Sequence, residues 1–369
     1  MAERSSGVWR LRVYVGDDPL TGNPRQVHRT FKGTEKEASR ALAVLVGRIE
    51  DHQVDRSSAT VGQLLDRWLE QIEPTRRPRT VAEYRRKIEH DIRPAIGSIR
   101  VDRLEADVLD RCYGQWLATG LAPGTVRHLS AIISAALGQG VKWGWLATNP
   151  AARSSPPSAQ SPTMKIPTVE ELSALYRAST DDQILATAVA MAALTGARRG
   201  ELVALRWSDV DMAAGTVTFA RSISVVKGTT HEGPTKTHQV RRLALDETAV
   251  EVLRLRWADQ LDLSQRAESP LVDDPYVLSH NANGGTSVNP DTISHRFSAL
   301  CTKTGLSFRF HDLRHFSVST LIAAGIDVRT VAERQGHAQA TMTLNRYAHA
   351  LPERDRAAAN VLGQTLKGG

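Results

Sequence analysis

The stretch "FRFHDLRHFS", residues 308–317, holds two histidines, an arginine and an aspartate within five consecutive positions. Three kinds of site have this composition: a metal site on His311 and His315, a structural ion-pair cluster, or a pocket that grips an anion. The metal site is disfavoured because no third ligand has a convincing spacing and Arg314 would repel a cation. His311 and Arg314 are expected on one helical face, which suits an anion grip. Asp312 and His315 are expected to orient the helix or to pair with arginines.

Three further clusters share this character. In "TGARRGELVALRWSDVD" a Thr-Gly pair breaks an alanine-rich helix just before Arg198 and Glu201. "GPTKTHQVRR" places Lys236 in an expected hairpin loop, and "QGHAQATMTLNRYAHA" sets His337 ten positions before Tyr347. Each cluster alone also has an ordinary explanation, such as surface arginines at a helix start or a solvated loop lysine. Their common chemistry makes the set informative.

In chain order, the motifs "TGARRGE", "PTKT", "HDLRH", "GH" and "RYAH" resemble the catalytic domain of the tyrosine recombinase (phage integrase) family. The resemblance covers residues 165–350, and it implies neither a cofactor nor a metal. The implied roles are Tyr347 as nucleophile, Arg198 and Arg314 as phosphate clamp, Lys236 as general acid, His311 and His337 as supporting donors, and Glu201 holding the first arginine.

Three positions leave the assignment open in detail. Gln335 stands before "GH" where the family often has leucine, which affects local packing. The doubled Arg198 and Arg199 leave a register ambiguity, although the "TGxR" spacing favours Arg198. Lys227 lies in the same strand region as Lys236 and is the alternative acid.

Phosphodiester cleavage explains why such residues would gather. Two guanidiniums can each grip non-bridging oxygens through paired donors and neutralise the charge of the transition state, so no metal is required. A phenol that attacks phosphorus stores the bond energy as a phosphotyrosyl ester, which a DNA 5′ hydroxyl later recovers without ATP. A lysine whose pKa is lowered by nearby arginines can protonate the leaving oxygen.

Length, charge and cysteine content limit the class of protein that could carry out this chemistry. A chain of 369 residues suggests about two or three domains, and a net charge of +7 with a pI of about 9.6 favours phosphate-rich partners. Only two cysteines occur, Cys112 and Cys301, so neither a disulfide framework nor a cysteine zinc cluster is available. The longest apolar run, from Ile184, is too short to span a bilayer. A soluble protein of the bacterial cytoplasm, without membrane contact, is expected.

The N-terminal residues, 1–57, predict a small sheet packed by one helix. Trp9, Leu11, Val13 and Val15 alternate with polar or basic neighbours, "DDPLTGNP" turns the chain into a second strand, and Thr34 with Glu37 forms a capping box. By architecture this segment resembles the arm-type DNA-binding domain of integrases.

Residues 58–153 predict an all-helical domain that resembles the core-binding domain of the same family. Thr60 and Gln63 open one helix, Thr80 and Glu83 a second, and two more follow in "EADVLDRCYGQWLA" and "GTVRHLSAIISAAL". The basic run between residues 76 and 93 is either a solvated helix face or a surface for phosphate contacts. Its members are Arg76, Arg77, Arg79, Arg85, Arg86, Lys87 and Arg93.

A linker, 154–165, precedes a catalytic domain, 166–369, that opens on the capping pair Thr168 and Glu171. It is expected to be mainly helical, with antiparallel strands near residues 217–225 and 240–245 and a C-terminal tail helix. That tail either packs on its own domain or, as often in the family, docks on a neighbouring subunit. The predicted fold class is therefore multidomain α+β.

The resemblance implies a site-specific recombinase that inserts and excises a phage or mobile element through a 3′-phosphotyrosine and a Holliday junction. Its expected partners are double-stranded attachment sites, three further copies of itself in a tetramer, and possible directionality and host DNA-bending factors. Two alternatives remain at this point: a DNA-binding protein that does not cleave, and a type IB topoisomerase. A supercoil relaxation assay separates the second from a recombinase.

Overall fold

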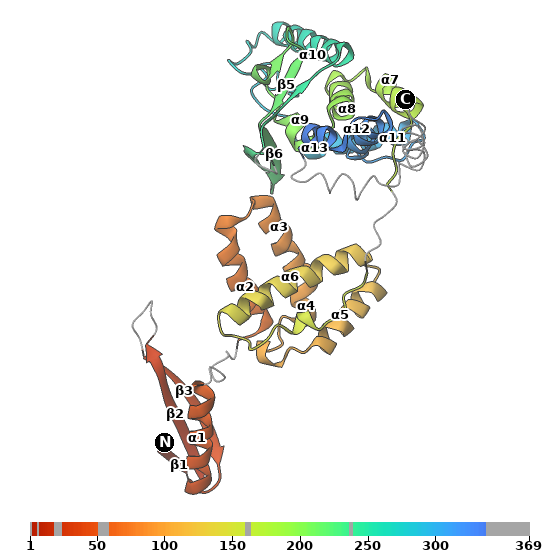
Figure 1. The fold of residues 1–369 in the computed structure, drawn as a ribbon. Helices are drawn as coiled ribbons and strands as arrows, with labels where there is room; N and C mark the ends of the chain where they lie inside the picture. Colours follow the sequence, from red (N-terminus) through yellow and green to blue (C-terminus); the bar gives the residue numbers. More distant parts are fainter. Residues whose placement is uncertain are drawn as a thin grey trace, which may run out of the picture. The chain divides into compact units, whose positions relative to one another are not determined.

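The computed structural model of this chain describes residues 2–5, 7–17, 24–50, 59–158, 164–235 and 239–336. The backbone packs into two units, Met1–Ser161 and Pro162–Gly369. The mixed fold expected from the sequence, mainly helical with small antiparallel sheets, is confirmed (Figure 1). The division of the first unit at residue 57 stays a prediction, and the expected tail helix lies outside the described residues.

A three-stranded antiparallel sheet and one helix open the first unit. The elements are β1 (Ala2–Ser5), β2 (Val8–Asp17), β3 (Pro24–Lys32) and α1 (Glu35–Glu50), with the strands in the order β1-β2-β3. The predicted alternation is confirmed, because Leu11 is buried between the exposed Arg10 and Arg12. The capping box is present, since the Thr34 amide donates to Glu37 at 2.9 Å. Strand β1 was not predicted, because its sequence "AERS" carries no apolar alternation.

The four predicted helices of the next part are present, joined by short turns. They are α2 (Val61–Ile72), η1 (Glu73–Thr75), α3 (Pro78–Lys87), η2 (Ile88–Ile92), α4 (Arg93–Ile96), η3 (Val101–Arg103), α5 (Ala106–Ala118), α6 (Pro123–Lys142) and η4 (Pro150–Ala152). Helix α2 begins at the predicted Thr60–Gln63 capping box. Its apolar face packs against α6, where Leu64 of α2 and Leu129 of α6 lie in one core.

The start of α3 differs from the prediction. Arg77 is the N-cap and Pro78 the first helical residue, so Thr80 lies inside the first turn. Proline fixes a helical φ and lacks an N–H that this position would leave unpaired, which makes it a stronger start signal than the threonine. The π-helical turn η2 was also missed; it places both Ile88 and Ile92 in the core.

The second unit is built around α8, which is buried on nearly all sides. Its helices are α7 (Val169–Ser179), α8 (Gln183–Thr195), α9 (Arg199–Val203), α10 (Glu247–Arg266), α11 (Pro290–Lys303), α12 (Asp312–Ala323) and α13 (Val328–Gln335), with the turn η5 (Trp207–Asp209). The predicted capping box of Thr168 and Glu171 opens α7. Because α8 is apolar all round, α7, α10 and α12 can pack against different faces of it (Figure 1).

Two small antiparallel sheets complete this unit. One has the order β4-β5-β8, and the other is the hairpin β6-β7. Their bounds are β4 (Val210–Asp211), β5 (Thr216–Phe219), β6 (Arg221–Val226), β7 (Thr229–Pro234) and β8 (Arg241–Ala244). The hairpin turns at Lys227 and Gly228, which both have positive φ, as a two-residue turn of type I′ requires.

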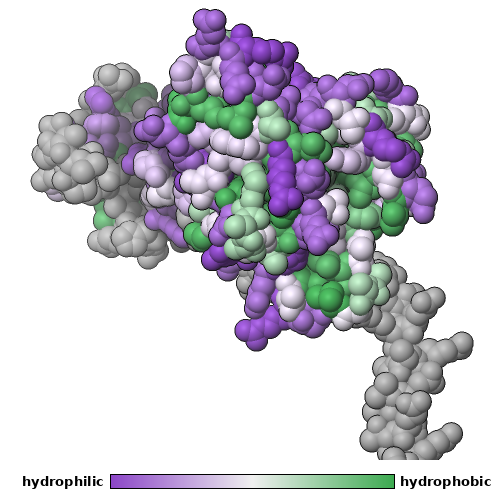
Figure 2. All heavy atoms as spheres, turned by 90° about the horizontal axis from the view of Figure 1, so that it is seen from above, coloured by the Kyte–Doolittle hydropathy of each residue, from purple (hydrophilic) through white to green (hydrophobic). Residues whose placement is uncertain are grey.

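The described residues form no helix long and apolar enough to cross a membrane. On the face that Figure 2 presents, hydrophobic side chains lie in small patches among hydrophilic ones. Single exposed apolar residues such as Leu255 and Val272 are ordinary for a protein surface.

Replacing Leu129 by alanine should lower the free energy of unfolding by about 2–5 kcal/mol, because its side chain is 0% exposed and the helices around it cannot fully close the cavity. Urea unfolding followed by tryptophan fluorescence measures the loss. The matched control is Leu117→Ala in α5, where the side chain is 38% exposed and the loss should stay below about 1 kcal/mol. Equal losses for the two variants would contradict the assigned core.

Candidate active site

Gly196 ends helix α8 and turns the chain toward the candidate site. Its φ of 64° is the left-handed conformation in which glycine has no steric cost. A Cβ at this position would lie 2.2 Å from the side-chain oxygen of Gln335, so any larger residue would displace that side chain. The predicted break between the alanine-rich helix and Arg198 is therefore confirmed.

Arg198 and Glu201 are joined at the start of α9. The guanidinium Nη1 of Arg198 donates to Glu201 Oε1 at 2.9 Å, and the Arg198 amide donates to Oε2 at 2.8 Å. Arg199 instead pairs with Asp291 at 2.9 Å and bonds the hydroxyl of Ser294 in α11. The two arginines thus point to different partners, and Arg198 is the one that lies beside Glu201.

Glu201 holds a second arginine. Nη2 of Arg241, on β8, donates to Glu201 Oε2 at 2.6 Å, and its guanidinium lies 4.7 Å from the centre of the Phe219 ring. Glu201 is 1% exposed and Arg241 is 7% exposed. Burial opposes the charge of Glu201 most strongly, but hydrogen bonding and charge from Arg241, and then from Arg198, outweigh it. The pKa of Glu201 consequently lies below its ordinary value.

Arg314 brings three distant segments together. From α12, its Nη1 donates to the carbonyl of Gly196 at 2.5 Å and its Nη2 to the carbonyl of Gln335 at 2.7 Å. Arg198 Nη2 donates to the carbonyl of Gly336 at 3.2 Å. The guanidiniums of the predicted clamp therefore bond consecutive carbonyls, directly before the position of His337.

The cluster "HDLRH" combines an ion pair with buried polar groups. Asp312 is buried and accepts hydrogen bonds from the amide and guanidinium of Arg309. The rings of His311 and His315 are 5.0 Å apart and nearly perpendicular, with His315 buried. Asp312 therefore pairs with an arginine, as one of the predictions for it stated. Within the described ranges no group of three His, Cys, Asp or Glu residues is arranged to hold a metal ion.

A pocket of about 430 Å³ opens beside His311. Basic side chains line it together with phenylalanines and serines, so it offers both positive charge and apolar surface. Its lining residues are Arg199, Ser294, Phe297, Ser298, Phe308, Arg309, Phe310 and His311.

Lys236, His337 and Tyr347 lie outside the described residues, and their roles stay predictions. The expected hairpin loop around Lys236 was wrong, because the hairpin turns at Lys227 and Gly228 instead. The segment with Lys236 connects β7 to β8, which belong to different sheets.

The sequence did not predict two residues that contact the candidate site, Arg241 and Gln335. Arg241 belongs to "RRLA", whose alternation buries Arg241 and Leu243, so the two-residue period was a usable signal for its burial. Gln335 is fully buried and donates to the Ser317 hydroxyl at 3.3 Å, while its own side-chain oxygen has no partner among the described atoms. No local pattern predicts that glutamine contact.

The basic run of the helical unit does not form one uniform surface. Arg93 bonds Glu89 and Asp66, and these bonds, first to Glu89 and then to Asp66, raise its pKa. Arg85 pairs with Glu73 at 3.4 Å, and Lys87 is buried. The exposed members of the run are Arg76, Arg77, Arg79, Arg85 and Arg86.

Two family models match this chain. Residues 165–354, just over half of the chain, match the model described as "Phage integrase family". Residues 60–117 match the model described as "Phage integrase, N-terminal SAM-like domain".

Two relatives, one named a tyrosine recombinase and one an integrase, match nearly the whole chain. A "Tyrosine recombinase XerC-like" protein of Caldanaerobacter subterraneus is 24% identical over 378 residues, covering 96% of this chain and 95% of the relative. The "ICEBs1 integrase" of Bacillus subtilis is 25% identical over 366 residues and covers 98% of each chain.

Solved structures show the same fold. The integrase of transposon Tn1549, in complex with a circular intermediate DNA, has a TM-score of 0.69 at 20% identity, covering 83% of this chain and 100% of that one. A lambda integrase tetramer bound to a Holliday junction has a TM-score of 0.57 at 20% identity, covering 92% and 95%.

Glu201→Gln should lower the free energy of unfolding by about 3–5 kcal/mol near neutral pH, because it leaves two guanidiniums without their buried counter-charge. The pKa of Glu201 is lowered in the folded state, so its contribution is present above the ordinary value of 4.5 and is lost as the pH falls through the folded value. The difference between wild type and variant should therefore shrink in acid. Urea unfolding over a pH series measures both effects.

The control for this variant is Asp291→Asn, which removes the more exposed partner of Arg199. Its cost should be about 1 kcal/mol or less, because an exposed ion pair contributes little. If Glu201→Gln is no more costly than Asp291→Asn at neutral pH, the buried carboxylate does not hold the site together.

Proposed function

The chain belongs to the phage integrase family of tyrosine recombinases, so it is an enzyme that cuts and rejoins DNA at specific sites, and we propose how its side chains do this. Tyr347 attacks the scissile phosphate and forms a 3′-phosphotyrosine, while the 5′ oxygen leaves. A 5′ hydroxyl of another strand then attacks phosphorus and releases the tyrosine. One pair of such exchanges forms a Holliday junction and a second pair resolves it, which inserts or excises a mobile element in bacterial DNA.

The observation that supports this proposal most directly is the convergence of Arg198 and Arg314 on the carbonyls of Gln335 and Gly336. It brings together motifs far apart in the chain, directly before the predicted donor His337. Two guanidiniums held on consecutive carbonyls can together neutralise the charge that builds on a phosphate during in-line attack. The side chain of Arg198 is 22% exposed, so a phosphate can approach it.

The remaining roles complete the reaction. Lys236 gives a proton to the leaving 5′ oxygen, His311 and His337 donate hydrogen bonds to the phosphate, and Glu201 orients Arg198. Positive charge comes from the arginines, and the energy of the broken bond is kept in the phosphotyrosyl ester, so the scheme uses neither a metal nor ATP.

Double-stranded attachment sites are the proposed substrate, bound by a tetramer like the lambda integrase tetramer on its Holliday junction. The helical domain, residues 58–153, contacts the core site through the exposed arginines of α3. The N-terminal domain, residues 1–57, binds separate arm sites. A directionality factor and a host DNA-bending protein are the proposed accessory partners of the recombinase.

Tyr347→Phe should abolish covalent attachment to DNA while leaving binding intact, because only the nucleophilic oxygen is removed. Wild type and variant are incubated in EDTA with a nicked duplex carrying an attachment sequence and are run on a denaturing protein gel. A covalent protein–DNA band with wild type alone is the expected result. A band that persists in Tyr347→Phe, or that disappears in EDTA, contradicts the proposal; binding without any band favours a non-cleaving DNA-binding protein.

Arg79→Ala combined with Arg86→Ala should weaken DNA binding and its salt dependence. The two exposed arginines lie two turns apart on α3, so they share one face. If each meets a phosphate, the slope of log K against log salt falls by about 1.8, at about 0.9 per contact. Binding is measured by fluorescence anisotropy over a salt series, with Arg103→Ala plus Arg111→Ala as the charge-matched control. An unchanged slope in the α3 variant would remove this helix from the DNA surface.

A further inference from the structure

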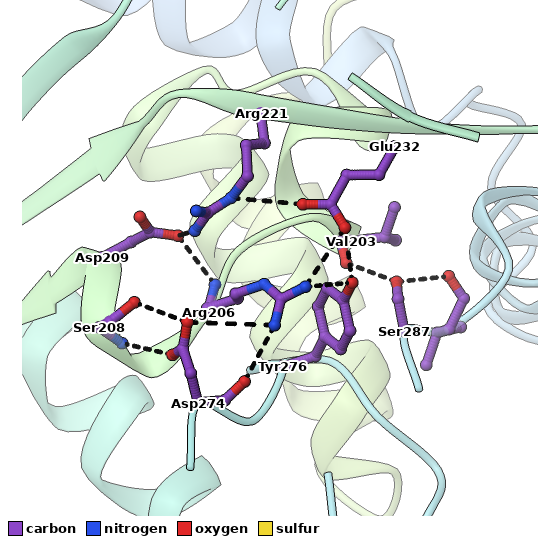
Figure 3. A network of polar contacts seen from close by, with 10 residues as sticks. Val203, Arg206, Ser208, Asp209, Arg221, Glu232, Asp274, Tyr276 and Ser287 are labelled. Carbon is purple, nitrogen blue, oxygen red and sulfur yellow. Dashed lines mark hydrogen bonds and ion pairs between the residues drawn. The ribbon is translucent and has the colours of Figure 1, made fainter. Parts of the chain in front are cut away.

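Glu232, on strand β7, lies at the centre of a polar network (Figure 3). Its Oε2 accepts from the Tyr276 hydroxyl at 2.7 Å and from Arg206 Nη2 at 3.3 Å. Its Oε1 lies 3.5 Å from Arg221 Nε on the paired strand β6. The side chain of Glu232 is 29% exposed, so these contacts are partly shielded from water.

The partners of Glu232 are themselves fixed to the body of the unit. The guanidinium of Arg206 lies 4.1 Å from the centre of the Tyr276 ring, and its Nη1 donates to the carbonyl of Asp274 at 3.1 Å. Asp209 accepts from the Arg206 amide at 3.0 Å and from Arg221 Nη2 at 2.5 Å. Figure 3 shows these side chains meeting from three separate segments of the chain.

Tyr276 is suited to be a permanent donor in this network. Burial raises the pKa of Tyr276, and the hydrogen bond to Glu232 and the charge of that residue raise it further. The phenol therefore keeps its proton and continues to donate to the carboxylate.

Strand β7 depends on such an attachment because its sheet has only two strands and it is β6, not β7, that packs on α9. An isolated two-stranded hairpin is at best marginally stable, and most side chains of β7 are exposed. Glu232 links this strand to residues 206 and 276, which belong to the body of the unit. The contacts of Glu232 therefore attach β7 to the body of the unit two residues before the strand ends, in addition to its pairing with β6.

The segment that carries Lys236 follows directly. Strand β7 ends at Pro234, and the buried Thr235 donates its hydroxyl proton to the carbonyl of Gln239 at 2.9 Å, across residues 236–238. Strand β8 then begins with Arg241, which is held by Glu201. Anchors thus stand on both sides of the lysine, with Glu232 on one and Arg241 on the other.

We propose that Glu232 is a positioning residue for the general acid: by tying β7 to Arg206 and Tyr276, it sets the place from which Lys236 reaches the leaving 5′ oxygen. This inference rests on the proposed role of Lys236. Loss of the Glu232 anchor impairs protonation of the leaving group and leaves the nucleophile and the arginine clamp in place.

A substrate with sulfur in place of the bridging 5′ oxygen separates these effects. In cleavage, Tyr347 loses its phenol proton to solvent and its Oη forms a bond to phosphorus, the bond from phosphorus to the 5′ atom breaks, and an oxygen leaving group takes a proton from Lys236. A thiolate is the anion of a much stronger acid, with a pKa of about 8.5, and departs without that proton. Variants that impair only the acid should therefore regain activity on the sulfur substrate.

The experiment compares single-turnover cleavage of the oxygen and sulfur substrates by the full-length protein. Lys236→Ala should be slower by about 10²–10⁴-fold on oxygen and near wild type on sulfur. Glu232→Gln should be slower by about tenfold or more on oxygen and should likewise recover on sulfur, because a small misplacement of a catalytic group is costly. Tyr276→Phe, which keeps the ring and removes one donor, should show a smaller defect of the same kind.

The control variants show which part of the inference each result supports or contradicts. Glu251→Gln removes an exposed carboxylate of α10 that pairs with Arg254 and should be unchanged on both substrates. If Lys236→Ala does not recover on sulfur, the acid assignment fails and the inference with it. If Lys236→Ala recovers while Glu232→Gln is equally slow on both substrates, or is unaffected on oxygen, the positioning role alone is overturned. A folding defect of Glu232→Gln is recognised by its melting curve, and Tyr276→Phe then decides by the same criterion.

Discussion

The buried carboxylate of Glu201 is the interaction on which the geometry of the candidate site depends. Removing an ion from water costs several kcal/mol, so a carboxylate with 1% exposure must be closely partnered. Glu201 meets this condition with two guanidiniums, one from the N-cap residue of α9 and one from β8. The same contacts that stabilise its charge therefore fix Arg198 relative to the strand that follows the Lys236 segment.

The second constraint is steric and acts between helix ends. The positive φ of Gly196 favours glycine, and a Cβ there would displace the closely packed side chain of Gln335. This contact brings the end of α8 against the end of α13, and Arg314 bonds a carbonyl of each. A site assembled from residues 196–201, 241, 314 and 335–336 is thus held across long sequence separations by bonds from arginines to backbone carbonyls and to the Glu201 carboxylate.

The sequence predicted local elements well and long-range contacts only through motif order. Helices with a capping box and a clear apolar face, such as α2 and α7, were placed correctly because both signals are local. The hairpin turn was misplaced because its position at Lys227 and Gly228 follows from the pairing of β6 with β7, for which the sequence carries only a two-residue signal. The convergence of Arg198 with Arg314 and the pairing of Arg241 with Glu201 depend on how the strands and helices pack, which no local pattern encodes.

The position of Arg314 between two helix ends has an electrostatic consequence. Carbonyl groups at a helix C-terminus carry a partial negative charge, equivalent to about half an elementary charge. Arg314 bonds the carbonyl of Gly196 at the end of α8 and that of Gln335 at the end of α13, so two such dipoles stabilise one buried cation. These carbonyls offset the mutual repulsion between the guanidiniums of Arg314 and Arg198 before DNA binds. The protein thus holds its positive groups close together in advance, and the cost of assembling them is met by folding rather than by substrate binding.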